Sequence, residues 1–178
     1  QRQMCIRDSQ KIDIPEDGVV NDIFTIDFPQ NITQVHFIKL RLFDTKGKEV
    51  ANTFYWRSND KYEGRKTLTG PTSSGFEDLS KLKQVQLKTR YQTYQEGDRH
   101  FIKAEIKNPS STVAFFTQLQ LLGQDKKPVR PSFYTDNFFS LLPGESKTVI
   151  IETAASDMPS EPTFVVKGWN IKPSSFKL

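Results

Sequence analysis

The stretch Val85-Gln86-Leu87-Lys88-Thr89-Arg90-Tyr91 decides the fold class, because odd-numbered residues predicted to face inward alternate with polar ones. Neighbouring side chains of a β-strand point to opposite faces, so this pattern predicts a strand with one buried face. Residues 102–107 repeat the pattern, with apolar residues at the even positions and charged residues at the odd ones. The two segments therefore predict two strands that bury their apolar faces in one core.

The rest of the chain shows a similar pattern of short strand-forming runs and turn residues. Short runs rich in Val, Ile, Phe, Tyr and Thr are separated by clusters of Pro, Gly, Asn, Asp and Ser, and no stretch shows a sustained helical period. We therefore predict an all-β fold. The predicted strands are residues 11–14, 22–28, 35–43, 49–57, 85–94, 100–107, 114–122, 129–135, 147–153 and 163–169.

The connections between these strands carry their own signals. Residues 44–48 should form a hairpin loop in which Gly47 provides a positive φ. Residues 60–74 read as a loop, and residues 76–82 could form one helical turn or a short connector.

The strands predict two consecutive immunoglobulin-like β-sandwiches with a boundary at about residue 82. Residues 83–178 have the size and the strand number of one such sandwich. Residues 10–82 supply only four strands, so we expect a partial sandwich that is truncated at its N-terminus and ends in a loop or linker. Residues 1–9 (QRQMCIRDS) lack a secretory apolar region and resemble nothing that follows. We interpret them as a non-native or mis-assembled leader and expect the natural protein to extend upstream.

Length and composition exclude several function classes. The 178 residues are too few for a complete (β/α)₈ barrel, which needs about 250. Lys and Arg number 25 against 21 Asp and Glu, and these charges are spread along the chain, so no nucleic-acid partner is expected. No segment is apolar enough to suggest a membrane partner. The single Cys5 excludes an internal disulfide, and His36 and His100 do not suggest a zinc site, so we expect no metal and no cofactor.

Catalytic residues are also not predicted. Hydrolysis of a glycosidic bond generally needs two facing carboxyl groups, one with a raised pKa. The close acidic pairs, Glu77 with Asp78, Glu96 with Asp98 and Asp136 with Glu145, all lie in turn-like surroundings where carboxylates are solvated. His36 falls on the apolar face of a predicted strand near its end, and we interpret it as a histidine at the edge of the core.

Aromatic residues supply the candidate carbohydrate contacts. Tyr55, Trp56, Tyr62 and Trp169 could each present a flat ring to the C–H face of a sugar. Strand alternation places Phe54 and Trp56 on one face, opposite Tyr55. For that face and for Trp169, burial in the core is the favoured interpretation.

Residues 136–146 (DNFFSLLPGES) form the most distinctive segment. Its pattern predicts a polar turn at residues 136–137, followed by a mostly apolar run at residues 138–142. A second turn should follow, in which Pro143 presets φ and Gly144 takes a conformation that strains other residues. The predicted structural motif consists of Asp136, Asn137, Pro143, Gly144 and Glu145. Asp136 and Asn137 could line a sugar site, but we expect them to cap their own backbone turn.

Together with Tyr55-Trp56, residues 113–116 (VAFF) and residues 168–170 (GWN), the segment 134–146 resembles the C-terminal β-sandwiches of glycoside hydrolase family 2. The similarity spans about residues 11–170 and points to the β-mannosidase and exo-β-D-glucosaminidase branch. It implies a non-catalytic accessory region of a retaining exo-β-glycosidase, whose catalytic glutamates lie in a (β/α)₈ barrel that no position here matches.

The resemblance further implies that the barrel and other domains of the same enzyme are the partners, with a β-linked oligosaccharide as a further candidate. It favours a periplasmic or extracellular location. The alternative is a free-standing carbohydrate-binding or adhesion module in which Tyr55, Trp56 or Trp169 stacks on sugar. Two coplanar aromatic rings facing solvent would favour that alternative, whereas burial of the rings would favour a scaffold.

Overall fold

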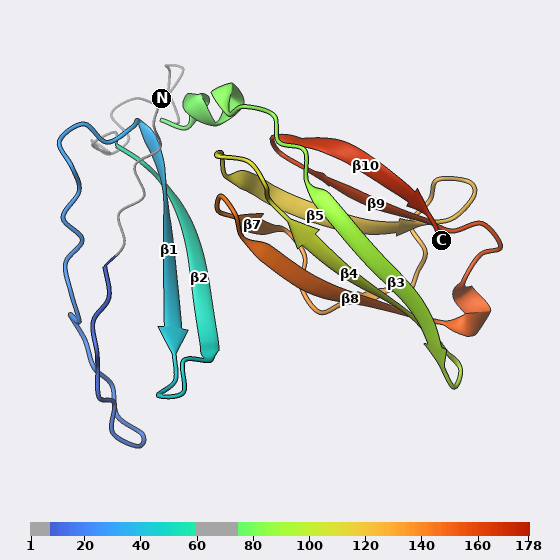
Figure 1. Ribbon diagram of the computed structural model, residues 1–178, viewed down its shortest axis with the longest axis horizontal. Helices are drawn as coiled ribbons and strands as arrows, with labels where there is room; N and C mark the ends of the chain where they lie inside the picture. The colour runs from blue at the N-terminus through green and yellow to red at the C-terminus, as the bar shows by residue number, and fades with distance from the viewer. Residues whose placement is uncertain (1–7, 60–74) are drawn as a thin grey trace, which may run out of the picture. The chain divides into compact units, whose positions relative to one another are not determined.

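The computed structural model describes residues 8–59 and 75–178, and within them the regular elements are β-strands and two short 3-10 helices (Figure 1). This agrees with the predicted all-β class. The chain divides into two compact units, Gln1–Leu79 and Ser80–Leu178. Each unit is described by itself below.

The first unit contains one antiparallel hairpin. Strand β1 (Val35–Phe43) pairs with strand β2 (Glu49–Ser58), so that Val35 lies opposite Ser58. The Asp44 carboxylate accepts hydrogen bonds from the backbone N–H groups of Lys46 and Lys48 at 2.9 and 2.8 Å, and Gly47 has φ +79°. The hairpin loop predicted at residues 44–48 is therefore confirmed.

The strands predicted at residues 11–14 and 22–28 are wrong, because both segments are irregular in the structure. Asp22 has φ +51°, which breaks an extended chain at the start of the second segment. Their apolar residues suggested strands, but no pairing of either segment with a strand is found among the described residues.

His36 lies at the start of β1 and is half-buried. Its ring meets the ring of Phe28 edge to face, with centroids 5.2 Å apart, in agreement with the interpretation of a core-edge histidine. Burial, followed by the positive charge of Arg57, lowers its pKa below the ordinary value.

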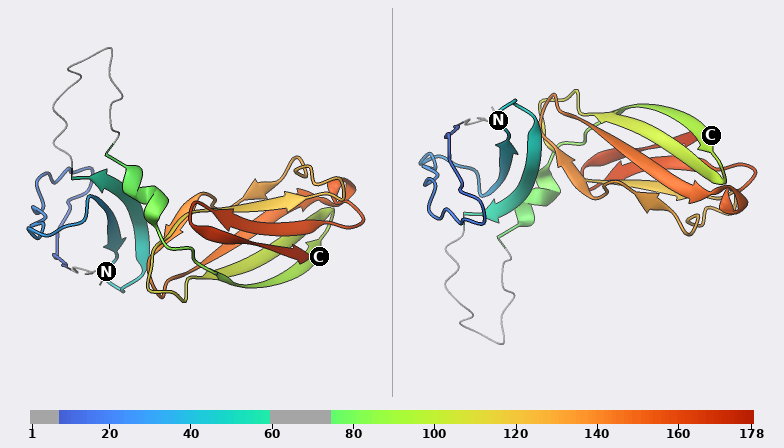
Figure 2. Two further views of the ribbon diagram at one scale, coloured as in Figure 1. Left: turned by 90° about the horizontal axis from the view of Figure 1, so that it is seen from above. Right: turned by 90° about the horizontal axis from the view of Figure 1, so that it is seen from below.

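The second unit is a sandwich of two four-stranded sheets, seen as two layers in Figure 1 and Figure 2. One sheet has the order β3-β4-β8-β6 and the other the order β10-β9-β5-β7. Their bounds are β3 (Lys88–Glu96), β4 (Arg99–Lys107), β5 (Ala114–Leu122), β6 (Phe133–Tyr134), β7 (Phe139–Leu141), β8 (Ser146–Ala154), β9 (Thr163–Gly168) and β10 (Ile171–Lys177).

The core lies between the two sheets. Ile102, Ala104 and Ile106 are fully buried, as their alternation predicts. They pack with buried apolar residues of both sheets, including Leu119 and Phe164.

The chain crosses between the sheets just before β3. Val85 forms a parallel bridge with Ile171 of β10, and its N–H donates to the carbonyl of Asn170 at 2.7 Å. From Lys88 onward the chain pairs instead with β4. Residues 85–94, predicted as one strand, therefore pair with two different sheets: Val85 with β10, and the residues from Lys88 onward with β4.

Other predicted bounds change as well. Of residues 129–135 only Phe133–Tyr134 is a strand, and the strand predicted to end at residue 169 ends at Gly168. Strands β7 and β10 were not predicted. Of the two alternatives for residues 76–82, the structure has the helical turn, the 3-10 helix η1 (Glu77–Lys81). A second 3-10 helix, η2 (Ala155–Asp157), follows β8.

Candidate functional site

Four aromatic rings from three parts of the second unit form a cluster that we call the aromatic edge: Phe115 and Phe116 of β5, Phe138 before β7, and Trp169 in the turn between β9 and β10. The ring centroids of Phe116 lie 5.6 Å from those of both Phe115 and Phe138. Trp169 meets Phe115 edge to face at 6.5 Å. Phe115 is buried, whereas Phe116, Phe138 and Trp169 are 39%, 50% and 57% exposed.

Two residues of the aromatic edge have an unusual backbone conformation. Phe116 has φ +57° and Phe138 has φ +58°, a region that bulky side chains rarely adopt. The pairing of β5 with β7 is irregular between Ala114 and Thr117, and Phe116 lies within this irregularity. As a result Phe115 faces the interior and Phe116 is exposed.

Two asparagine side chains hold the loops of the aromatic edge against β5. The Asn137 amide accepts a hydrogen bond from the N–H of Leu119 at 2.8 Å and donates one to its carbonyl at 3.0 Å. The Asn170 amide oxygen accepts from the N–H of Phe115 at 2.8 Å, and its nitrogen donates to the carbonyl of Val113, also at 2.8 Å. Each amide therefore replaces a neighbouring strand as the partner of β5.

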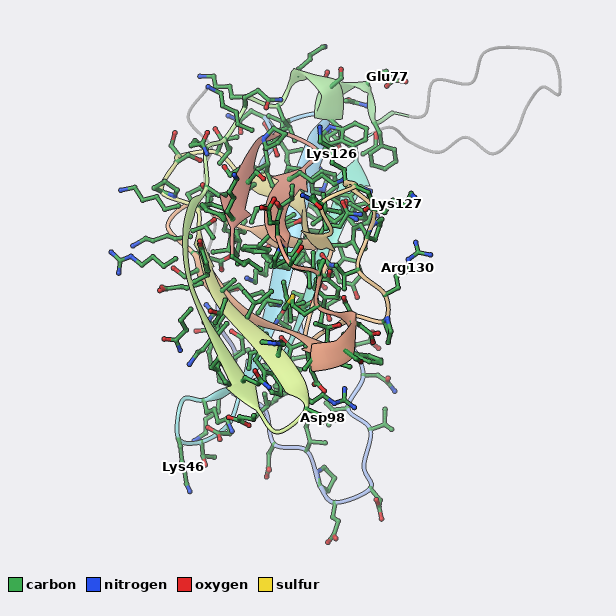
Figure 3. All side chains as sticks on the ribbon, turned by 90° about the vertical axis from the view of Figure 1, so that its right-hand side faces the viewer. Lys46, Glu77, Asp98, Lys126, Lys127 and Arg130 are labelled. Atoms are coloured by element: carbon green, nitrogen blue, oxygen red, sulfur yellow. The ribbon has the colours of Figure 1, made fainter. Side chains whose placement is uncertain are left out.

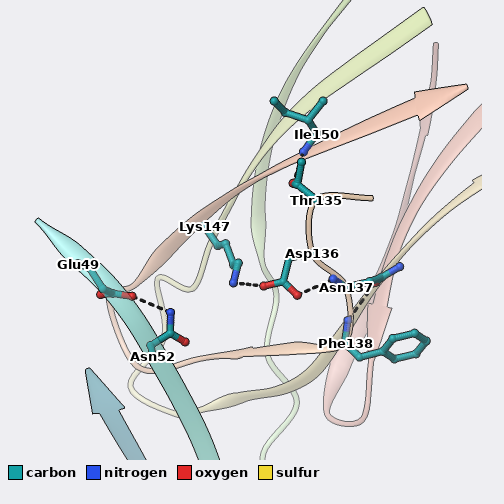
Figure 4. A network of polar contacts seen from close by, with 8 residues as sticks. All are labelled: Glu49, Asn52, Thr135, Asp136, Asn137, Phe138, Lys147 and Ile150. Atoms are coloured by element: carbon teal, nitrogen blue, oxygen red, sulfur yellow. Dashed lines mark hydrogen bonds and ion pairs between the residues drawn. The ribbon is translucent and has the colours of Figure 1, made fainter. Parts of the chain in front are cut away.

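The polar turn before β7 has the capping role that the sequence predicts. The Asp136 carboxylate accepts a hydrogen bond from the N–H of Asn137 at 2.7 Å and forms an ion pair with Lys147, as Figure 4 shows. The Asn137 oxygen also accepts from the N–H of Phe138 at 3.1 Å. The further pairing between Asn137 and Leu119 could not be predicted from local sequence, because it joins a connection to a strand residue 18 positions away.

The turn at Pro143 and Gly144 has the predicted conformation. Gly144 has φ +81°, and its N–H donates to the carbonyl of Asn108 at 2.9 Å. The Glu145 carboxylate accepts from the N–H of Leu142 at 2.8 Å. Glu145 thus closes the turn that begins β8.

The remaining predicted aromatic residues belong to the first unit. Tyr55 and Trp56 are adjacent in β2, so they lie on opposite faces of the hairpin, and they are 48% and 42% exposed. Tyr62 lies outside the described residues. The favoured burial of Trp56 and Trp169 in a core is wrong, since both are exposed. Trp56 is exposed on a sheet of only two described strands, and Trp169 is exposed because it falls in a turn.

The aromatic edge does not form a flat platform. The planes of Phe116 and Phe138 are inclined by 51°, and those of Phe115 and Trp169 by 69°. A sugar ring stacks on one flat face, so this arrangement offers single rings and no extended stacking surface.

Two of the acidic residues considered above, Asp136 and Glu145, make structural contacts. Asp136 pairs with Lys147, and Glu145 caps a backbone N–H. Glu49 of the first unit was not among those candidates. The Arg41 guanidinium hydrogen-bonds to it at 2.5 Å and holds the pKa of this half-buried carboxyl below its ordinary value, opposite to the shift that a general acid requires.

Within residues 8–59 and 75–178, no group of three or more His, Cys, Asp or Glu side chains could hold a metal ion. In the same described ranges, no helix has the length and apolar character needed to cross a membrane.

Comparison with known proteins shows which family this chain resembles. The sequence profile of the family described as the exo-beta-D-glucosaminidase Ig-fold domain matches residues 67–171, which is more than half of the chain. An exo-beta-D-glucosaminidase from Streptomyces avermitilis is 30% identical over 149 residues, covering 78% of this chain. One from Amycolatopsis orientalis is 27% identical over 157 residues, covering 82%. The chain spans only 16% and 15% of the lengths of these two relatives.

A solved structure agrees in fold. The crystal structure of the exo-chitosanase CsxA from Amycolatopsis orientalis superposes on 88% of this chain and 20% of that one, with a TM-score of 0.73 at 23% sequence identity.

Proposed function

This chain belongs to the family of exo-β-D-glucosaminidase Ig-fold domains, and on that premise we propose that it is the non-catalytic accessory region of a glycoside hydrolase. We propose further that the parent enzyme is a retaining family 2 exo-β-D-glucosaminidase. In this proposal the chain lies C-terminal to a catalytic (β/α)₈ barrel in the same polypeptide, and it stabilises and shapes that barrel. The relatives are named exo-β-D-glucosaminidases, so the proposal takes that branch in place of the β-mannosidase one.

The proposal rests on the contacts made by the distinctive segment at residues 136–146. Asp136, Asn137 and Glu145 all bind backbone groups or a lysine within the sandwich. A segment whose polar residues hold a turn and a strand edge in place suits a rigid support. Such a support can hold the loops of a neighbouring catalytic domain in a productive geometry.

The net charge of the second unit also favours a scaffold function over the binding of a glucosaminide. Residues 80–178 contain 14 Lys and Arg residues against 9 Asp and Glu residues. A glucosaminide carries an amino group that is positively charged when protonated, so a unit with an excess of positive charge does not attract such a substrate.

The aromatic edge is the surface through which we expect the unit to contact the rest of the enzyme. Exposed aromatic residues that lie together are typical of protein interfaces. Phe116, Phe138 and Trp169 meet this description, and their inclined planes suit an irregular protein surface better than a sugar.

Two measurements test the proposal. The isolated chain should not hydrolyse p-nitrophenyl β-D-glucosaminide or β-D-mannoside. In the polypeptide that joins this chain to its catalytic region, Trp169→Ala should lower the melting temperature of the catalytic region and its half-life at elevated temperature. Phe133→Ala is the matched control, because Phe133 is also an exposed aromatic residue but lies on β6, in the other sheet. Turnover by the isolated chain, or equal behaviour of the two variants, would contradict the proposal.

The alternative function is a free-standing carbohydrate-binding module, and the exposure of Trp169 is the observation that favours it. Titration of the chain with glucosamine oligosaccharides, followed by tryptophan fluorescence, separates the two functions. A scaffold predicts no change, whereas stacking on Trp169 predicts a saturable shift that Trp169→Ala removes.

A further inference from the structure

A groove of about 200 Å³ lies beside β5. Its floor is the β5 segment at residues 118–120, and its wall is the connection that runs from Pro128 to Asn137. Ligand sites for drug-sized molecules have about 300 to 1,000 Å³, so this groove suits one sugar ring or a group of similar size.

The walls of the groove are held by hydrogen bonds to β5. The Asn137 amide binds both backbone groups of Leu119, and the Tyr134 hydroxyl accepts from the N–H of Leu121 at 3.0 Å. The Ser132 hydroxyl donates to the carbonyl of Val129 at 2.7 Å. These hydrogen bonds fix the wall of the groove relative to β5.

Four polar groups in the groove remain available. The Tyr134 hydroxyl accepts a hydrogen bond but keeps its own hydrogen to donate. The amides of Gln118 and Gln120 and the guanidinium of Arg130 make no hydrogen bond or ion pair within the part of the chain that the structure describes. These groups offer several donors, two amide acceptors and one positive charge.

The charge of the groove selects against cations. None of the residues that line it is acidic. Lys126 and Lys127 precede the wall in the same connection and lie on the same side of the molecule as Arg130, as Figure 3 shows. Asp125 neutralises Lys127 at 3.1 Å, which leaves Lys126 and Arg130 in excess.

We propose that this groove binds an acidic sugar, with the carboxylate of a uronic acid residue on Arg130 and its hydroxyl groups on Gln118, Gln120 and Tyr134. A guanidinium binds a planar carboxylate through paired hydrogen bonds. Side-chain amides both donate and accept, and they match hydroxyl groups, which do the same. A simple carboxylate ion would leave the amide oxygens unused, which is why the proposal commits to a sugar. The site lies beyond the proposed scaffold function, which assigns no ligand to this groove.

The test is a titration of the complete chain, followed by amide NMR shifts, with D-glucuronate, D-glucose, D-glucosamine and acetate. We expect glucuronate to bind most tightly, with shifts at residues 118–120 and 128–134. Arg130→Gln should weaken glucuronate binding about tenfold or more, because it removes a charged hydrogen bond. Gln120→Leu should weaken it without a change of charge.

Lys103→Gln is the matched control, because it removes the same charge from an exposed position on β4 in the other sheet. It should leave the affinity unchanged. The proposal is overturned if glucuronate causes no shifts, if acetate or glucosamine binds as tightly as glucuronate, or if Arg130→Gln behaves like Lys103→Gln.

Discussion

The side-chain oxygen of Asn170 accepts a hydrogen bond from the backbone N–H of Phe115 at 2.8 Å, although the two residues are 55 positions apart. The same amide donates to the carbonyls of Val113 and Lys83 at 2.8 and 2.9 Å. One buried side chain thus joins the start of β5, the entry to the sandwich and the turn that carries Trp169. This contact links the stability of the second unit to the position of the aromatic edge.

Replacement of this amide should be costly. In Asn170→Ala, the N–H of Phe115 and the carbonyls of Val113 and Lys83 lose their partner, and a buried unsatisfied group costs about 1 to 3 kcal/mol. We expect the free energy of unfolding to fall by about 2 to 4 kcal/mol in urea titrations. Gln86→Ala, which removes an exposed hydrogen bond to Ser174, should change it by less than about 0.5 kcal/mol. A similar loss in both variants would show that the Asn170 contacts stabilise the unit no more than an exposed hydrogen bond does.

The turn before β8 offers a test of backbone strain alone. Gly144 has φ +81°, and a Cβ placed there meets no atom within 4 Å. Gly144→Ala should therefore cost about 1 kcal/mol through its backbone conformation, with no steric clash. Gly123→Ala is the control, because its φ is not in the left-handed region and the nearest atom that its Cβ would meet, the Asp125 Oδ1 at 3.3 Å, belongs to a side chain and not to the backbone. Thermal unfolding of both variants measures the difference, and an equal loss would contradict the role of φ.

Local patterns predicted those parts of the fold that local chemistry determines. The alternation at residues 102–107 placed Ile102, Ala104 and Ile106 in the core. The turn at Gly144 and the loop at Gly47 followed from the conformational freedom of glycine. In each case the deciding residues are neighbours in the sequence.

The parts that were missed depend on distant partners. Strand β10 contains Pro173 and two serines and has no apolar alternation, and it is a strand because it pairs with β9 at the edge of its sheet, where proline is tolerated. Residues 22–28 have the apolar content of a strand but no strand partner among the described residues. Propensity alone could not separate these two cases.

The candidate site was only partly predictable for the same reason. The sequence identified Trp169 and the segment 136–146 as distinctive. It could not show that Phe116 and Phe138 both adopt positive φ, or that their rings meet. Nor could it show the groove beside β5, which forms between a strand and a connection that composition alone had suggested to be one longer strand.

The backbone strain at Phe138 predicts different effects in the isolated chain and in the whole enzyme. In Phe138→Asn, the loss of a half-exposed ring costs about 1 to 2 kcal/mol, and relief of the left-handed conformation returns a similar amount. The isolated chain should therefore unfold within about 1 kcal/mol of the wild type. The proposed function makes the aromatic edge the contact with the rest of the enzyme. On that proposal the melting temperature of the polypeptide that includes the catalytic region should fall, because this contact surface loses a ring.

Phe133→Asn is the control for both measurements, since Phe133 is exposed and its φ is not positive. It should not change the melting temperature of the longer polypeptide. If Phe138→Asn also leaves that temperature unchanged, the aromatic edge is not a docking surface.

The Tyr134 hydroxyl predicts the alkaline behaviour of the second unit. Burial raises the pKa of this phenol above its ordinary value of 10.0, and the hydrogen bond from the N–H of Leu121 acts in the opposite direction. Because the folded state holds the proton more tightly than the unfolded state, the associated stability is fully present below about pH 10. It is lost as the pH rises from there through the raised pKa of the folded state.

Urea titrations of the wild type and of Tyr134→Phe, from neutral pH to above pH 10, measure this effect. Below about pH 9 the variant should be less stable by a constant amount of about 1 to 2 kcal/mol, because the N–H of Leu121 loses its acceptor. Above about pH 10 the difference should shrink, since only the wild type must release a proton from this buried group. A difference that stays constant across the whole range would show that Tyr134 does not contribute to the pH dependence of folding.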